Sequence, residues 1–441
     1  MLLRDIASQV PDYRQLPTVE SMRSRTEALR ARSKPDVLIR EIGRSRLGET
    51  IDMITIGSGP LQVLLVGTPH PNEPIGCLTI EFLIEKLIAD PSLCSASQCT
   101  WHFVKTIEPD GLRLNEGWLA RPADASAYLA NFFRPALDEQ AEYTFPLSTA
   151  AHVFNVPIPE NIAYREAIRI AEPDLLYSLH NSEYGGVFYV VSRDVPSLLQ
   201  KLSTQPAQFG ARLDQIGELG AEMTPLAPGV FKAPDIATWI EATGARNTWR
   251  AGQSVFGHCA PSNTFILTVE TPYWHEPDDS TYNGTPVLLS DTLAEMPAWH
   301  TEGLGLMDQY LDDLAEAAEG QDVRFVLALR EAQAFARRFL SQAFQLPPMP
   351  LDAIAARALK RSTRLASLRA PAMLGRLGRR IAARSEFPAI SARNANAQAS
   401  ACVAAALAEP WLGQGLQAFP LRNSVVLQVQ ALIDSIYALR V

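Results

Sequence analysis

The chain is 441 residues long and 47% hydrophobic, which is enough to bury a core larger than that of one ordinary domain. Its formal net charge is −9, and no uninterrupted apolar stretch reaches membrane-spanning length, so a membrane span is excluded. Charge within the first six residues does not fit a secretory leader, and the five cysteines are sparse and unpatterned. We therefore expect a cytoplasmic protein with reduced thiols.

The first 107 residues are predicted to form a helix, short strands and a second helix. The first helical pattern covers residues 19–32. Short strand patterns, among them the apolar run 61–67, flank a second helix predicted over residues 73–89. Between this run and the body of that helix lies the segment His70-Pro71-Asn72-Glu73.

His70 and Glu73 have the spacing of two metal ligands at a strand-to-helix junction. The strand end presents the imidazole, and the first helical turn brings the carboxylate to the same side of the chain. Zinc accepts both donor types, and a catalytic zinc takes three protein ligands. The spacing alone also fits a helix-start carboxylate beside an ordinary loop histidine, because such pairs recur by chance. The assignment therefore depends on residues farther along the chain.

Residues 108–160 are rich in Pro, Asn and aromatic residues and are predicted to be an irregular stretch that lines a site. A helical pattern follows at residues 162–170, and then a buried-strand pattern at residues 175–179. This strand ends at His180, which is followed by polar residues. A second histidine at the exit of a hydrophobic strand is what a two-His, one-Glu zinc site would need, so His180 is the candidate third ligand.

Glu270 ends the β-branched and apolar run 264–269, which is predicted to be a central strand. A carboxylate that emerges from a core strand is costly to bury unless it is paired or functional. Beside a bound metal ion, Glu270 could act as a general base.

With these motifs in order, the sequence resembles the zinc metallocarboxypeptidase family. The matching elements, over about residues 15–315, are Gly43-Arg44-Ser45 with Gly48, His70-x-x-Glu73, Pro109-Asp110-Gly111, Ser178-Leu179-His180-Asn181 and Thr268-Val269-Glu270. The resemblance implies one zinc ion per chain, held by His70, Glu73 and His180. It also implies that Glu270 takes a proton from the attacking water and later passes it to the departing amine.

The sequence departs from the family pattern in the residues that bind substrate. The arginine that grips the substrate's terminal carboxylate, usually beside an asparagine, has no clean counterpart. Arg113, Asn115 and Arg134 are the candidates, with Arg121 in reserve, because an arginine fork donates two parallel hydrogen bonds to a carboxylate. Each of them could equally tie down a long loop.

The family's tyrosine that closes over bound substrate also has no counterpart at the expected place. Tyr184 and Tyr273 lie near the predicted ligands and base in the sequence, and we expect both to be packing aromatics.

The alternation of strands and helices predicts an α/β fold, a mixed sheet covered by helices on both faces, with its site where strands end. We predict a zinc carboxypeptidase-like catalytic domain at residues 1–318, closed by a helix at residues 291–317. Residues 319–441 are predicted to be an all-helical extension rich in Ala, Leu and Arg. From residue 321 onward, sixteen basic and six acidic residues give +10, so residues 1–320 carry −19.

The opposite charges of the two parts favour a helical cap that docks on the acidic part, in the same chain or in a homo-oligomer. Two other hypotheses are a basic amphipathic helix on an anionic membrane surface and a contact with nucleic acid. Nucleic acid is not expected, since no binding motif accompanies the arginines.

The leading functional hypothesis is a zinc-dependent hydrolase that removes a C-terminal residue from small peptides by activating water. An alternative is an N-acyl amino acid deacylase of the aspartoacylase and succinylglutamate desuccinylase type, which shares the two-His, one-Glu site. A further alternative is a non-catalytic carboxylate-binding protein on the same scaffold. The intact set of ligands and base argues against that last alternative.

Overall fold

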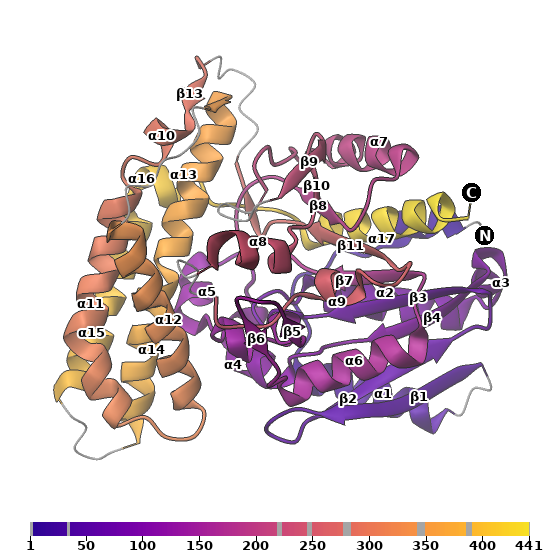
Figure 1. Cartoon of the computed structure of the whole chain (residues 1–441), viewed down its shortest axis with the longest axis horizontal. Coiled ribbons are helices and arrows are strands. Elements are labelled where there is room, and N and C mark those ends of the chain that lie inside the picture. The colour runs from indigo at the N-terminus through magenta and orange to yellow at the C-terminus, as the bar shows by residue number, and fades with distance from the viewer. Residues whose placement is uncertain are drawn as a thin grey trace.

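The computed structural model describes residues 3–32, 36–217, 223–244, 249–276, 284–341, 349–384 and 390–440. Figure 1 shows a twisted sheet with helices on both faces, and a group of long helices packed beside it. The predicted mixed α/β sheet and the helical C-terminal region are both confirmed.

The described residues form one nine-stranded sheet and three pairs of two-residue strands. The sheet strands, in spatial order, are β1 (Val37–Arg44), β2 (Thr50–Ile56), β4 (Cys99–Val104), β3 (Leu61–Gly67), β7 (Leu175–Leu179), β11 (Phe265–Glu270), β8 (Phe188–Val191), β10 (Val230–Lys232) and β9 (Thr224–Ala227). The short pairs are β5 (Leu147–Ser148) with β6 (Val153–Phe154), β12 (Trp274–His275) with β15 (Gln417–Ala418), and β13 (Val287–Leu288) with β14 (Pro350–Leu351).

The helices that accompany the sheet are α1 (Val19–Ala31), α2 (Ile75–Ala89), α3 (Ser92–Ser97), α4 (Pro109–Leu119), α5 (Ala125–Asn131), α6 (Pro159–Ala171), α7 (Pro196–Thr204), α8 (Ile236–Thr243), α9 (Val255–Cys259) and α17 (Leu421–Ala438). The helices beside the sheet are α10 (Leu289–Thr292), α11 (Met296–Glu316), α12 (Asp322–Ser341), α13 (Ala353–Ser367), α14 (Arg369–Ala383), α15 (Ile390–Ala408) and α16 (Pro410–Gly413). Short 3-10 turns are η1 (Leu3–Gln9), η2 (Leu137–Glu139), η3 (Ala141–Tyr143) and η4 (Pro206–Phe209).

The central strands are apolar throughout because both faces of the sheet are covered. In β3, Val63 and Leu65 belong to the core beneath α2 and α17. The alternate residues Leu64 and Val66 belong to a second core, which α6 covers. A strand buried on both sides therefore reads as a continuous apolar run rather than as an alternating one.

Strands β3, β7 and β11 are neighbours and run parallel to one another. Antiparallel pairing begins on either side of the β4–β3–β7–β11 group, at β2 and at β8. Because the carboxyl ends of parallel strands share one edge, the residues that follow β3, β7 and β11 meet at the same place.

Residues 108–160 are more regular than predicted, since they include α4 and α5. Pro109 lies at the start of α4, where its missing N–H has no intrahelical partner to lose. Gly111 is needed for close packing, because a Cβ there would lie 2.6 Å from Cβ of Pro71. Pro109 belongs to the composition that suggested a loop but instead begins a helix, and Gly111 lets this helix approach the segment that carries His70 and Glu73.

The predicted closing helix at residues 291–317 is observed as α10 and α11. Helix α11 packs against α12, α14 and α15, while α17 returns to the sheet and contacts α2, β7 and β11 (Figure 1). The division of the chain at residue 318 stays a prediction.

The basic helices are docked on the rest of the same chain. On α14, Arg376 donates to the carbonyl oxygen of Asn131 and Arg379 to that of Ala130, both at the end of α5. The apolar residues Met373, Leu374, Leu377 and Ile381 of α14 are all buried. No helix in the described ranges is long and apolar enough to cross a membrane.

Candidate metal centre and active site

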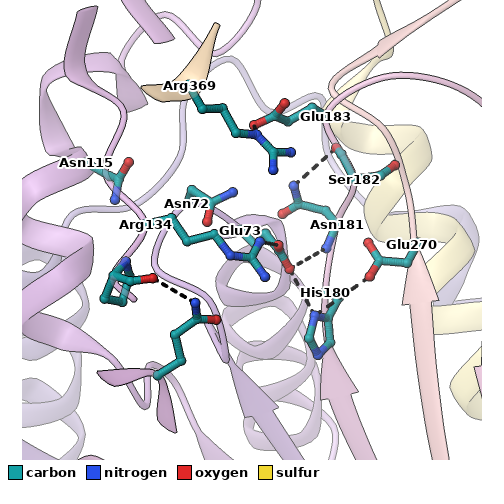
Figure 2. Close-up of polar contacts among 12 residues, drawn as sticks. Asn72, Glu73, Asn115, Arg134, His180, Asn181, Ser182, Glu183, Glu270 and Arg369 are labelled. Carbon is teal, nitrogen blue, oxygen red and sulfur yellow. Dashed lines mark hydrogen bonds and ion pairs between the residues drawn. The ribbon is translucent and has the colours of Figure 1, made fainter. Parts of the chain in front are cut away.

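The candidate site lies where β3, β7 and β11 end. His70 follows β3 by three residues, His180 comes directly after β7, and Glu270 is the last residue of β11. Figure 2 shows the side chains of Glu73, His180 and Glu270 directed toward one another, with Arg134 beside Glu73. The strand order thus brings together residues that are up to 200 positions apart in the sequence.

Three of these side chains are close enough to share one ion. A ring nitrogen of His70, a carboxylate oxygen of Glu73 and a ring nitrogen of His180 all lie within 4.8 Å of one another, and all three residues are buried. Nδ1 of His180 is 3.0 Å from Oε2 of Glu73 and 3.8 Å from Oε1 of Glu270. Glu270 is therefore next to this group, and its side chain is 16% exposed.

The residues present fit a zinc ion. Nδ1 of His70 is buried and has no hydrogen-bond partner among the described residues, which is costly unless a ligand completes it. Two imidazoles and one carboxylate are also a donor set that zinc accepts in catalytic sites.

The electrostatics of the group favour neutral His70 and ionised Glu73. Burial, and then the positive charge of Arg134, lower the pKa of His70. Burial alone would raise the pKa of Glu73, but His70, Arg134 and His180 outweigh it, so the net shift is downward. Burial lowers the pKa of His180, but its bond to Glu73 and the nearby carboxylates raise it to about 9. The carboxylates around His180 thus compensate a positive charge there in addition to that of Arg134, as a cation site requires.

Glu73 was predicted to lie in the first turn of the second helix, but it lies in a turn that precedes α2. The N–H of Glu73 donates to the carbonyl of His70 at 3.0 Å, which closes the turn. The side chain of Asn181, the residue after His180, accepts from the N–H of Ile75 at the start of α2. This bond holds the start of α2 against the end of β7.

His180 is oriented from behind by two polar residues. Its Nε2 atom lies 3.1 Å from Oγ of Ser178, and this hydroxyl in turn donates to Oε2 of Glu142 at 3.4 Å. Burial raises the pKa of Glu142 to about 7. A hydrogen-bond partner on one ring nitrogen, here Nε2, directs the other nitrogen, here Nδ1, toward a metal. Glu142 was not singled out from the sequence, because its neighbours show no ligand spacing.

Arg134 is the predicted substrate-binding arginine that lies at the site. Its Nη1 atom is 2.7 Å from Oε1 of Glu73, and its side chain is 22% exposed. Its role toward substrate stays a prediction.

The other candidates are engaged in the scaffold. Arg113, on α4, pairs with Glu49 at 2.6 Å and with Glu20 at 3.7 Å. The buried amide of Asn115 donates to the carbonyls of Gly111 and Phe133 and accepts from Phe133 N–H and Trp118 Nε1. The reserve candidate, Arg121, forms an exposed pair with Asp124. These contacts give all three a structural role, and binding by Arg113 or Asn115 stays untested.

The two tyrosines are buried, as expected. Tyr273 donates to the carbonyl oxygen of Asn72 at 2.9 Å, and Tyr184 donates to Glu276. Two family-like motifs also contact each other, since Oγ of Ser45 donates to Asp110 at 2.7 Å. The β1–β2 hairpin is thereby attached to α4, which supports the His70 segment.

A further residue that the sequence did not reveal is Arg369, at the start of α14. It lies in the basic run 353–385, where its spacing does not distinguish it from its neighbours. Figure 2 shows its side chain entering the site beside Glu183, above Asn72 and Arg134.

Comparison with known proteins gives one family match. Residues 23–125 match the model of the family described as zinc carboxypeptidase. No curated protein matches the chain.

Several solved structures are similar over part of the chain. A metallo-carboxypeptidase from Burkholderia cenocepacia is 17% identical over 58% of this chain, with a TM-score of 0.33. That alignment spans only 60% of the Burkholderia chain. Carboxypeptidase A from Helicoverpa armigera is 16% identical over 64% of this chain and 71% of its own (TM-score 0.38). The murein-tripeptide amidase MpaA from Escherichia coli O157 is 18% identical over 55% of this chain and 85% of its own, with a TM-score of 0.27.

At these identities and TM-scores the structural likenesses say nothing about activity. The family match covers the β1–β2 hairpin, the His70-x-x-Glu73 segment and α4. It confirms, over residues 23–125 and thus over less than a quarter of the chain, the resemblance to the zinc carboxypeptidases predicted from the motifs.

Proposed function

We propose that this protein is a zinc-dependent hydrolase that cleaves a peptide or peptide-like amide bond, removing the C-terminal residue from small peptides. The observation that carries the proposal is the convergence of donor atoms from His70, Glu73 and His180 within 4.8 Å, with Glu270 at its side. The family match supports the reaction class.

In this proposal His70 and His180 hold the metal through ring nitrogens and Glu73 through its carboxylate. Zinc in such a site supplies Lewis acidity at the scissile carbonyl and makes a water molecule more acidic. Glu270 accepts the proton of the attacking water on its carboxylate and delivers it to the departing amine nitrogen. Arg134, held by Glu73, places a positive charge where the carbonyl oxygen gains negative charge.

Removal and return of the metal test the proposal. Treatment with a chelator should abolish hydrolysis of a peptide panel, and stoichiometric zinc should restore it. The panel should contain N-acetylated dipeptides and N-acyl amino acids, because the second class would be preferred by a deacylase. Full hydrolysis by metal-free protein would refute the zinc proposal.

We further propose one zinc ion per chain and a cytoplasmic location. The single three-ligand group found in the described ranges supports the stoichiometry. The thiols of all five cysteines are free, which supports a reducing compartment. Metal analysis of purified protein should give one zinc per chain, and two or more would contradict the stoichiometry.

A further inference from the structure

Arg369 belongs to the basic helical part of the chain, yet its guanidinium lies at the candidate site. Figure 2 shows the side chain descending from α14, with its terminal nitrogens directed past Glu183 toward the space above Arg134 and Asn181. Burial lowers the pKa of Arg369, but nearby negative charges outweigh burial and raise it. Glu183 is the largest of these charges, and the carboxylate of Glu73 is another. Arg369 is therefore close enough to sense the proposed metal ligands.

The guanidinium is held by one edge and one face. Its Nε donates to Oε1 of Glu183 at 2.8 Å, and its carbon lies 5.7 Å from the ring centre of Phe132. Glu183 is buried, and the hydroxyl of Tyr128 donates to the same carboxylate oxygen. These contacts fix the plane of the guanidinium.

The two terminal nitrogens of Arg369 make no hydrogen bond to any part of the chain that the structure describes. One third of the side chain is exposed. Four N–H donors therefore point away from Glu183, in the planar fork that matches a carboxylate. A bond through Nε alone leaves this fork available to a ligand.

Other arginines of α14 are used differently. Arg376 and Arg379 donate to backbone carbonyls at the end of α5, and Arg380 pairs with Asp322. These three bonds dock the helix, whereas the fork of Arg369 contributes nothing to docking.

A second polar side chain lies close to Arg369 (Figure 2). The side chain of Asn72 lies below Arg369 in Figure 2, and its buried Oδ1 has no hydrogen-bond partner among the described residues. A buried acceptor of this kind is expected to be completed by a ligand N–H. An amide N–H next to a carboxylate is what the last residue of a peptide, or an N-acyl amino acid, presents.

We propose that Arg369 binds the free carboxylate of the substrate, so that the helical region completes the active site and selects acids over amides. This inference rests on the proposed function. It names a specificity-determining residue outside the part of the chain that matches the family model.

The test compares each N-acetyl-Ala-Xaa dipeptide with its C-terminal amide, using wild-type protein, Arg369→Ala, Arg369→Lys and Arg379→Ala. For the acids, Arg369→Ala should lower kcat/KM by about 10- to 100-fold, mainly through KM, because a charged hydrogen-bonded pair is lost. Activity on the amides should stay within about twofold, so the preference for acids should collapse. Lysine, which keeps the charge but not the fork, should give an intermediate loss.

Arg379→Ala is the matched control, since it removes an exposed arginine of the same helix that contacts α5 rather than the site. Any loss that it causes through weaker docking should be equal for acids and amides, so the preference for acids should stay at the wild-type level. Equal losses on acids and amides after Arg369→Ala would show that the residue only supports Glu183, and would overturn the inference. An unchanged preference would overturn it too. If Arg369→Ala does not fold, Arg369→Lys carries the same comparison.

Failure of the proposed function can be recognised separately. If wild-type protein hydrolyses none of the panel, calorimetric binding of the same acids and amides to zinc-loaded protein tests Arg369 directly. Acids should bind to wild type and lose affinity in both Arg369 variants. If no acid binds to wild type, the inference is wrong whatever the reaction is.

Discussion

At the scale of single residues, the proposed chemistry depends on which carboxylate would hold the metal and which would remain able to move a proton. Glu73 is buried and bonded to His180 and Arg134, and its neighbours His70, Arg134 and His180 lower its pKa and keep it ionised. Glu270 lies at a strand end and is partly exposed, 3.8 Å from Nδ1 of His180. The two carboxylates therefore have different neighbours, and the more accessible one suits proton transfer.

Substitution of Glu270 should separate zinc binding from turnover. Glu270→Gln keeps the shape of the side chain but cannot accept a proton, so kcat should fall by about 10²- to 10⁴-fold. Bound zinc, measured by metal analysis, should remain at the wild-type level, because the three ligands are intact. Undiminished kcat in a metal-loaded variant would refute the role of Glu270 as base.

At the scale of elements, α2 must approach β7 closely for Glu73 to reach His180. Gly76, in the first turn of α2, allows this approach. A Cβ at position 76 would lie 2.4 Å from Cβ of Leu179 and 3.1 Å from its carbonyl oxygen. Neither atom can move easily, since both belong to a central strand.

Gly76→Ala should therefore overpack this contact and lower the free energy of unfolding by about 1–3 kcal/mol, despite the better helix propensity of alanine. Zinc affinity should fall as well, because α2 and β7 would separate. Gly305→Ala in α11 is the control, since a Cβ there meets nothing within 4 Å. It should stabilise the protein by up to about 1 kcal/mol in chemical denaturation. Equal effects of the two substitutions would contradict the close-approach argument.

At the scale of the whole molecule, a buried charge network joins the helical part to the sheet. Arg324 of α12 lies 3.9 Å from Glu108, just before α4, and Arg46 of the β1–β2 hairpin pairs with Glu139 and Glu160. Burial, and then the nearby Glu160, raise the pKa of Glu108 from 4.5 to about 8, although Arg324 and Arg46 oppose the shift.

The raised pKa of Glu108 predicts that the free energy of unfolding falls as the pH rises. The folded state holds the proton of Glu108 more tightly than the unfolded state, so the associated stabilisation is complete below about pH 4.5 and is lost as the pH rises to about 8. Glu108→Gln should remove this part of the pH dependence, on the order of a few kcal/mol. Denaturant unfolding between pH 4.5 and 8 measures it, with the exposed Glu316→Gln as control. If the unfolding free energy of Glu108→Gln depended on pH as steeply as that of the wild type, the raised pKa of Glu108 would not be its cause.

The last helix, α17, packs against the sheet and against α2, so the C-terminal region supports the core of the sheet. On α17, Gln428 donates to the carbonyl oxygen of His180 at 2.9 Å and accepts from Thr79 of α2. Truncation after residue 318 would expose the apolar face of α2 and leave these groups without partners. The truncated chain should lose cooperative unfolding and zinc binding, as measured by calorimetry and metal analysis. A folded, zinc-binding fragment 1–318 would instead support an independent catalytic domain.

The sequence by itself determined the class of the fold, and it predicted the side chains that meet at the candidate site. Apolar runs that end in His180 and Glu270 predict strands whose ends carry functional groups, and His70-x-x-Glu73 follows another such strand. These features are local, since strand propensity, burial and the spacing of ligands are expressed within a few residues. The loop predicted at residues 108–160 was wrong where α4 forms, because Pro109 begins the helix there and Gly111 serves a tertiary contact.

Only the tertiary structure decided which arginines reach the site. Arg113, Arg134 and Arg369 have the same chemistry, and nothing in their neighbours along the chain indicates their partners. The fold places Arg113 against Glu49 and directs Arg134 and Arg369 toward the ends of β3 and β7. The physical reason is that a long, flexible, charged side chain takes its position from the surfaces packed around it, and here those surfaces come from helices hundreds of residues apart.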